Sequence, residues 1–189
     1  MLKLKFEINP YYLTIHSLKK SWGSKPFRGW TKLAEKIKSD GPFIFENSNE
    51  VFIEINNYNQ LKKVLYKTGE TFEKIIKTNE FRKLFEETKK YLSWLEKTWT
   101  ENGEQALSIL KDITKLKIPD ITIKVLVTHP KLNNGRSIAK KRIICWGHPE
   151  DWKNYTIVYL CHEILHILTY KKFSDEKIMH AIIELTTDN

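Results

Sequence analysis

The sequence predicts an α+β fold, in which a small β-sheet is combined with a larger set of helices. Two observations lead to this prediction. Apolar and polar residues alternate over residues 2–8 and 121–127, as in half-buried strands, and apolar residues recur at helical spacing between residues 58 and 117. Apolar residues make up 41% of the 189 residues and charged residues 29%, which is typical of a globular protein with its own core.

The N-terminal part, residues 1–117, is expected to be mainly helical and to pack as a subdomain. Its expected elements are, in order, a strand over 2–8, helices over 11–20 and 30–38, brief extended segments over 43–45 and 51–55, and several helices between 58 and 117. Glycine and proline residues between 21 and 29 indicate a loop. Glu101, Asn102 and Gly103 are expected to interrupt the later helical stretch.

The C-terminal part is expected to span residues 118–189. Its expected elements are a strand over 121–127, a turn at 133–135, a returning strand over 139–146, a helix from about 149 to 171, and a last helix capped by Ser174 or Asp175. We expect the two strands to pair as a hairpin with a long loop. Pro149 suits the first turn of the long helix, and the acidic pair Glu150 and Asp151 suits the positive end of its dipole.

Composition also indicates the cellular compartment of the protein and the state of its cysteines. Its two cysteines, Cys145 and Cys161, are fewer than a disulfide-stapled domain usually carries, so we expect both to be reduced and the protein to be cytoplasmic. No apolar run is long enough for a transmembrane helix, and residues 1–10 lack the apolar core of a signal peptide. The net charge of +9 comes from scattered lysines, which favours a solvated basic surface over a nucleic-acid footprint.

The segment 161–166 indicates the chemistry, because it contains H-E-x-x-H within apolar sequence. On a helix, His162 and His166 share a face and can offer two imidazole nitrogens to one metal ion. Glu163 points about 100° away, near enough to hold a water molecule on that metal. A helix buried nearly all round needs partners for such polar groups, and a metal ion supplies one.

A further helix follows after a short turn and can fold back onto the motif helix. It carries Glu184 and Asp188, four residues apart and therefore on one face. An H-E-x-x-H match alone arises by chance in packed helices, but this second pair of acidic residues favours a zinc site.

The pattern His162-Glu163-x-x-His166, then 17 residues, then Glu184-x-x-x-Asp188 resembles the gluzincin clan of metallopeptidases, most of all its minimal members. The resemblance covers about residues 120–189. It implies a zincin-like core of a small sheet, an active-site helix and a glutamate helix. It also implies that His162, His166 and Glu184 bind Zn²⁺, that Glu163 is the general base, and that Asp188 supports His162 from behind.

The expected activity is hydrolysis of a peptide or protein substrate. Zinc would activate a water molecule, and Glu163 would take its proton and pass it to the leaving amine. An edge strand over residues 142–146 is expected to align an extended peptide by strand addition. Donors that would stabilise the oxyanion are expected upstream of Asp188, and the candidates are Tyr170, His129, His148 and His180.

The alternative is a latent or non-catalytic zincin-like binding module. Its basic surface would hold nucleic acid or an acidic partner, and its zinc would be structural or vestigial. The two hypotheses share the zinc site and differ in whether peptide bonds are cleaved.

Overall fold

The structure is a computed structural model that describes residues 2–21, 35, 39, 48–65, 69–172 and 175–187. Its internal contacts divide the chain into two compact units. The C-terminal unit comprises residues 1–7 and 90–189, and the N-terminal unit comprises residues 8–89. These bounds differ from the division expected at residue 117, because the first strand and the second half of the longest helix make their contacts with the C-terminal part.

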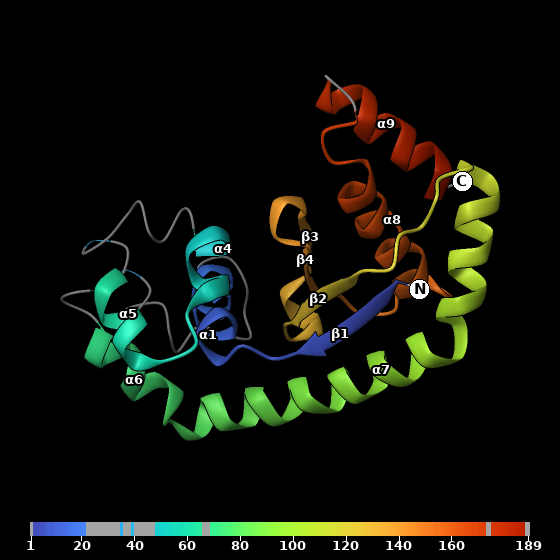
Figure 1. The fold of residues 1–189 in the computed structure, drawn as a ribbon. Helices are drawn as coiled ribbons and strands as arrows, with labels where there is room; N and C mark the ends of the chain where they lie inside the picture. Colours follow the sequence, from blue (N-terminus) through green and yellow to red (C-terminus); the bar gives the residue numbers. More distant parts are fainter. Residues whose placement is uncertain are drawn as a thin grey trace. The chain divides into compact units, whose positions relative to one another are not determined.

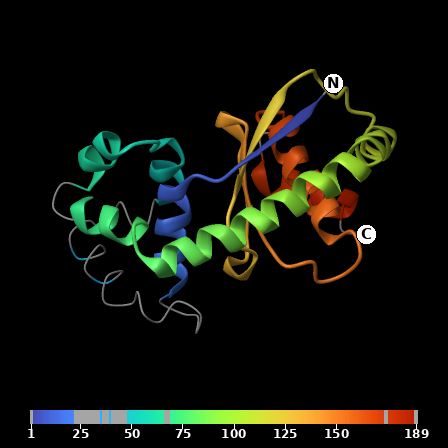
Figure 2. The ribbon, with the colours of Figure 1, turned by 90° about the horizontal axis from the view of Figure 1, so that it is seen from below.

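A four-stranded mixed sheet lies in the C-terminal unit, and the α+β fold class is confirmed (Figure 1). Its strands are β1 (Lys3–Glu7), β2 (Thr122–Val127), β3 (Asn134–Ile138) and β4 (Ile143–Gly147), in the order β1-β2-β4-β3. β1 and β2 run side by side (Figure 2), and the pairs β1·β2 and β2·β4 are parallel. The buried apolar runs of β2 and β4 are typical of interior strands.

The pairing of β4 corrects the predicted hairpin. β2 and β4 are parallel, with Val125 opposite Ile144, and the antiparallel partner of β4 is β3. The sequence of β3 has no apolar alternation, which is why it escapes notice. Two 3-10 helices, η3 (Pro130–Leu132) and η4 (Ala139–Lys141), flank it. The predicted edge strand over 142–146 is also wrong, because β4 is an interior strand and β3 lies at the edge.

The N-terminal unit is helical, as the sequence predicts. It contains α1 (Pro10–Ser21), α4 (Ser48–Val51), the 3-10 helix η2 (Phe52–Glu54), α5 (Tyr58–Val64), α6 (Gly69–Ile76) and the start of α7. The extended segment expected over 51–55 is wrong, because this stretch contains the end of α4 and the 3-10 helix η2, which buries Phe52 and Ile53. The loop over 21–29, the helix over 30–38 and the segment over 43–45 fall, except for Ser21 and Glu35, outside the described residues.

Asn9 fixes the start of α1. Its Oδ1 accepts hydrogen bonds from the backbone N–H groups of Tyr11 and Tyr12, at 2.9 and 3.0 Å, which is the behaviour of an N-cap residue. Its Nδ2 donates to the carbonyl of Ile55 at 2.8 Å. One buried amide therefore joins the first helix of the N-terminal unit to the chain after η2.

α7 (Asn79–Thr114) is one unbroken helix, so the break predicted at 101–103 is wrong. Gly103 is buried, and a Cβ atom at this position would lie 2.6 Å from the Trp99 ring. The Asn102 side chain donates to the carbonyl of Thr98 at 2.9 Å. The glycine therefore makes room for an indole on its own helix and does not mark a turn.

Two helices complete the C-terminal unit. α8 (Tyr155–Thr169) begins later than the sequence predicts, after Asn154 in the left-handed conformation. Glu150 still caps the N-terminus of α8, because Oε2 of Glu150 accepts a hydrogen bond from the N–H of Thr156 at 3.1 Å. α9 (Glu176–Thr187) follows Asp175, whose Oδ1 accepts from the N–H of Lys177 at 2.8 Å, so the predicted cap is confirmed. In the described part of the chain, no helix combines the length and apolar character needed to cross a bilayer.

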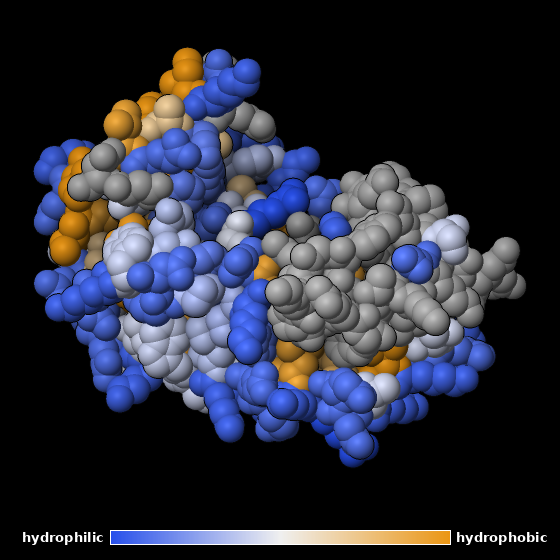
Figure 3. Space-filling view, turned by 180° about the vertical axis from the view of Figure 1, so that it is seen from behind, coloured by the Kyte–Doolittle hydropathy of each residue, from blue (hydrophilic) through white to orange (hydrophobic). Residues whose placement is uncertain are grey.

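On the face shown in Figure 3, most of the described residues are hydrophilic, and apolar residues are exposed at a few places. Those of the C-terminal unit that lie on helices α7 and α9 are Trp94, Ile109, Ile113, Ile178, Ile182 and Leu185.

Tyr91 ties the end of β4 to α7. Its hydroxyl donates to the carbonyl of His148 at 2.6 Å and accepts from Nε1 of Trp146 at 3.0 Å. Burial raises the pKa of Tyr91 to about 12, although the hydrogen bonds with His148 and Trp146 act in the other direction. The segment that leaves β4 is thus held by a partly buried, neutral phenol.

Replacing Tyr91 with phenylalanine should lower the free energy of unfolding by about 1–3 kcal/mol, because the indole N–H of Trp146 loses its acceptor. An unfolded tyrosine titrates near 10.0, and the pKa of the folded Tyr91 is about 12. Its contribution is therefore complete below pH 10 and is lost as the pH rises through about 12, and the variant should lack this alkaline loss. Denaturant unfolding at several pH values measures both effects.

Lys90→Ala, a change at the exposed neighbouring position, is the control, and its free energy of unfolding should stay within about 0.5 kcal/mol of that of the parent. A Tyr91→Phe protein as stable as the parent would contradict this role.

Candidate metal centre

The two motif histidines lie one turn apart on the buried helix α8. His162 is 6% exposed, and its Nε2 lies 3.2 Å from Nε2 of His166. Apolar neighbours such as Ile164 and Leu165 are buried on the other sides of the helix. The two imidazoles therefore share one face, as their spacing of four residues predicts.

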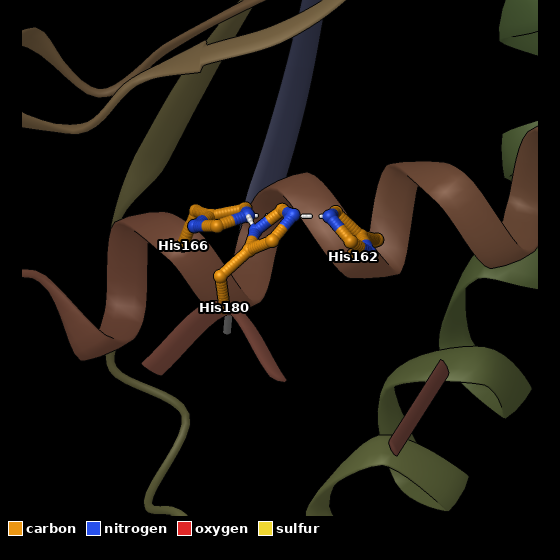
Figure 4. Close-up of side chains that lie close together, drawn as sticks. All are labelled: His162, His166 and His180. Carbon is orange, nitrogen blue, oxygen red and sulfur yellow. Dashed lines mark hydrogen bonds between the residues drawn. The ribbon is translucent and has the colours of Figure 1, made fainter. Parts of the chain in front are cut away.

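α9 brings a third imidazole to this pair (Figure 4). Nδ1 of His180 lies 3.2 Å from Nε2 of His166, and the two rings stack with centroids 5.1 Å apart. Each of the three histidines offers one nitrogen, and these atoms lie within 4.8 Å of one another. Among the described residues, His162, His166 and His180 are thus a group that could hold a metal ion.

The spacing and the charge state of this group fit a metal ion. Tetrahedral zinc with Zn–N bonds of about 2.0–2.1 Å places two nitrogen ligands about 3.4 Å apart. The two contacts to His166 measure 3.2 Å each. Burial, reinforced by the neighbouring charges of His162 and His180, lowers the pKa of His166 to about 4. The imidazole of His166 is therefore neutral at neutral pH, which is the form that binds metals.

Glu184, the ligand that the resemblance implies, also faces this group. Its Oε1 lies 3.0 Å from Nε2 of His180, the ring nitrogen that does not contact His166. The carboxylate is not one of the three clustered donor atoms, and Glu184 as a ligand stays a prediction.

The outer nitrogen of His162 has a partner on α9 as well. Nδ1 of His162 lies 3.2 Å from Oγ1 of Thr187. Asp188, which the resemblance places in this supporting role, lies outside the described residues.

Glu163 faces the same cavity and is 7% exposed. Burial raises the pKa of Glu163 above the usual range of a glutamate. Hydrogen bonds from the hydroxyl and the backbone N–H of Ser137 oppose that rise, as do the charges of His180 and Arg136. A carboxyl group whose proton affinity is increased, and which two donors hold in place, is suited to accept a proton.

These side chains line an open cavity of about 570 Å³. β3 contributes one part of its wall, and rings from the end of β4 and from α8 contribute another. The centroids of Tyr155 and Tyr159 lie 4.4 Å apart, and His148 stacks on Tyr155 at 4.7 Å. The full lining is Gly135, Arg136, Ser137, Trp146, His148, Tyr155, Tyr159, His162, Glu163, His166, His180 and Glu184.

Sequence reasoning misses several of these residues. Tyr155 and Tyr159 precede His162 by seven and three positions, so the helical period alone would have placed them on its face. Arg136 and Ser137 have no such local signal, because the pairing of β3 with β4 brings them to the site.

The four candidate oxyanion donors have different positions. His148 and His180 line the cavity. His129 is buried, and its Nδ1 accepts from the N–H of Lys131 at 3.2 Å. Tyr170 follows the last turn of α8, with the Lys171 ammonium over its ring. Neither His129 nor Tyr170 is among the described residues that line the cavity.

Comparison of the chain with models of known families, with curated proteins and with solved structures gives no match. The arguments below therefore depend on the geometry of the site and on the sequence motif.

We expect the protein, stripped with a chelator, to take up one Zn²⁺ per chain. At a free zinc concentration of about 100 times the dissociation constant, the gain in stability should be about 2.7 kcal/mol. His162→Ala and His166→Ala should each weaken zinc binding by more than about 100-fold, which exceeds the usual 10–100-fold effect of changing a ligand's outer partner. Elemental analysis and thermal unfolding with and without zinc are the measurements. His129→Asn, which retains an acceptor for Lys131, is the matched control and should bind zinc normally. Equal zinc uptake by all four proteins would rule out this centre.

Proposed function

We propose that the protein is a zinc-dependent metallopeptidase with a zincin-like core formed by the sheet, α8 and α9. The observation that supports this most strongly is the meeting of five side chains in one open cavity. They are the paired imidazoles of H-E-x-x-H, the carboxyl group of Glu163 between them in sequence, and the side chains of His180 and Glu184 on α9. A buried site built only for stability has no need of an open cavity beside its metal ligands.

His162 and His166 would hold the ion together with a residue of α9. That residue is Glu184 according to the gluzincin resemblance and His180 according to the clustering of donor atoms. A zinc ion bound here supplies Lewis-acid polarisation of a peptide carbonyl and lowers the pKa of water toward neutrality.

Glu163 would act as the general base. It accepts a proton as water adds to the carbonyl carbon, and it returns that proton to the amine nitrogen as the C–N bond breaks. Ser137 holds the Glu163 carboxylate through its hydroxyl and its N–H, so that the base is oriented before the substrate arrives. The cavity lining also includes His148, the candidate donor to the developing oxyanion. Its Nδ1 faces the Pro149 carbonyl at 3.0 Å and its Nε2 faces the Tyr155 hydroxyl at 3.4 Å, so His148 would have to change partners to take this role.

β3 would align the substrate. It is an edge strand with β4 as its neighbour in the described sheet, and three of its residues line the cavity: Gly135, Arg136 and Ser137. An extended peptide can add to such an edge through main-chain hydrogen bonds, which suits an enzyme that acts on unfolded segments or flexible loops. This role replaces the one that the sequence assigns to residues 142–146.

Glu163→Gln should lower kcat for peptide cleavage by about 10²–10⁴-fold, because the amide cannot accept the proton of water. Zinc content should be unchanged, since Glu163 is not a ligand. Hydrolysis of a quenched fluorescent peptide library, measured beside elemental analysis, tests both statements. Glu104→Gln, an exposed change on α7, is the control and should retain full activity.

Unchanged proteolysis by the Glu163→Gln protein would reject the mechanism. A parent protein that holds zinc and cleaves no peptide would instead support the alternative of a non-catalytic zinc-binding module.

A further inference from the structure

We infer that His180 is the third metal ligand and that Glu184 acts behind it, as the carboxylate that orients His180. This inference rests on the metal centre of the proposed function and concerns only which side chain of α9 enters the coordination shell. It differs from the ligand set that the gluzincin resemblance implies.

The hydrogen bonding of His180 indicates the tautomer of a ligand. A carboxylate is an acceptor, so the contact of 3.0 Å between Oε1 of Glu184 and Nε2 of His180 requires the proton of the neutral ring to be on Nε2. Nδ1 of His180 then carries the lone pair, and Nδ1 is the atom that lies 3.2 Å from Nε2 of His166. Metal-ligating histidines commonly donate their outer N–H to a carboxylate in this way.

The tautomer of His162 is fixed in a similar way, by a residue at the C-terminal end of α9. The hydroxyl of Thr187 donates to the carbonyl of Ile183 at 2.9 Å, so its oxygen is left to accept from Nδ1–H of His162 at 3.2 Å. The lone pair of His162 is then on Nε2, which faces Nε2 of His166 at 3.2 Å. Two outer partners on one helix therefore turn two lone pairs toward a common point.

The position of Glu184 suits an outer partner. Its side chain is 53% exposed and that of His180 is 51% exposed. Glu184 follows His180 by one helical turn, so both project from the same face of α9. For Glu184 to become the ligand, one of its oxygens would have to join the clustered donor atoms, which in this structure are the nitrogens of His162, His166 and His180.

The two ligand sets predict different metal chemistry. Three neutral imidazoles leave the full double charge on the ion, whereas a glutamate ligand neutralises half of it. Imidazole ligands suit Zn²⁺, Cu²⁺ and Ni²⁺ among divalent ions, so the expected ligand is a late first-row metal ion. Mg²⁺ and Ca²⁺, which prefer oxygen ligands, should not compete.

Zinc affinity of three variants distinguishes the two sets. With His180 as ligand and Glu184 as outer partner, His180→Ala should weaken zinc binding by more than about 100-fold, as His166→Ala does, and Glu184→Gln should weaken it by only about 10–100-fold. The titration uses chelator-stripped protein, Zn²⁺ and a competing chromophoric chelator. Circular dichroism establishes that each variant is folded. Lys177→Ala, an exposed change on α9, should bind like the parent.

Counting the imidazoles gives a second measurement that does not depend on affinity. X-ray absorption at the zinc edge should show three imidazole ligands in the parent and in Glu184→Gln. Two imidazoles in the parent, or a Glu184→Gln loss as large as that of His166→Ala beside near-normal binding by His180→Ala, would overturn the inference. In either case the metal centre and the proposed peptidase would still stand, whereas loss of zinc uptake by the parent would remove both.

Discussion

The site depends on one constraint: α8 is buried on nearly all sides, and the polar side chains that it carries must find partners inside the protein. Both His162 and Glu163 are among its buried residues. An unpaired imidazole or carboxyl group in such surroundings is costly, so each must be hydrogen-bonded or bound to a metal. Residues of α9 contact the two histidines, and Ser137 of β3 donates hydrogen bonds to Glu163.

The sheet therefore holds a side chain of the candidate site in place as well as forming part of the core. β3 is held in place by its antiparallel pairing with β4, where Arg136 lies opposite Cys145 and Ser137 opposite Ile144. Ser137 then reaches Glu163 with two donors. The end of β4 is in turn fixed by the hydrogen bonds between Trp146, His148 and Tyr91 of α7. The position of Glu163 therefore depends on contacts that extend from α8 through the sheet to a helix far away in sequence.

What the sequence could predict follows from the range of the interactions involved. The face shared by His162 and His166, the cap at Asp175 and the strands β1 and β2 depend on residues a few positions apart, and these predictions agree with the structure. The parallel pairing of β2 with β4 and the edge position of β3 are long-range features that no local pattern specifies. The break predicted at Gly103 is wrong for a different reason. Glycine commonly marks a turn, but here it lies inside an intact helix and leaves room for the Trp99 ring.

α9 shows why the sequence could not decide between His180 and Glu184 as the proposed third metal ligand. His180, Ile183, Glu184 and Thr187 are spaced at intervals of three and four residues, so they form one face, and the buried Ile183 packs that face inward. The more regular apolar stripe of the same helix, Ile178, Ile182 and Leu185, is exposed. Hydrophobic periodicity alone would predict that this apolar stripe faces the core. In that orientation, His180 and Glu184 would point away from the histidine pair. The observed rotation brings both into the lining of the cavity. Their hydrogen bonds, which sequence spacing does not specify, are the basis for proposing that His180 binds the metal and that Glu184 orients His180.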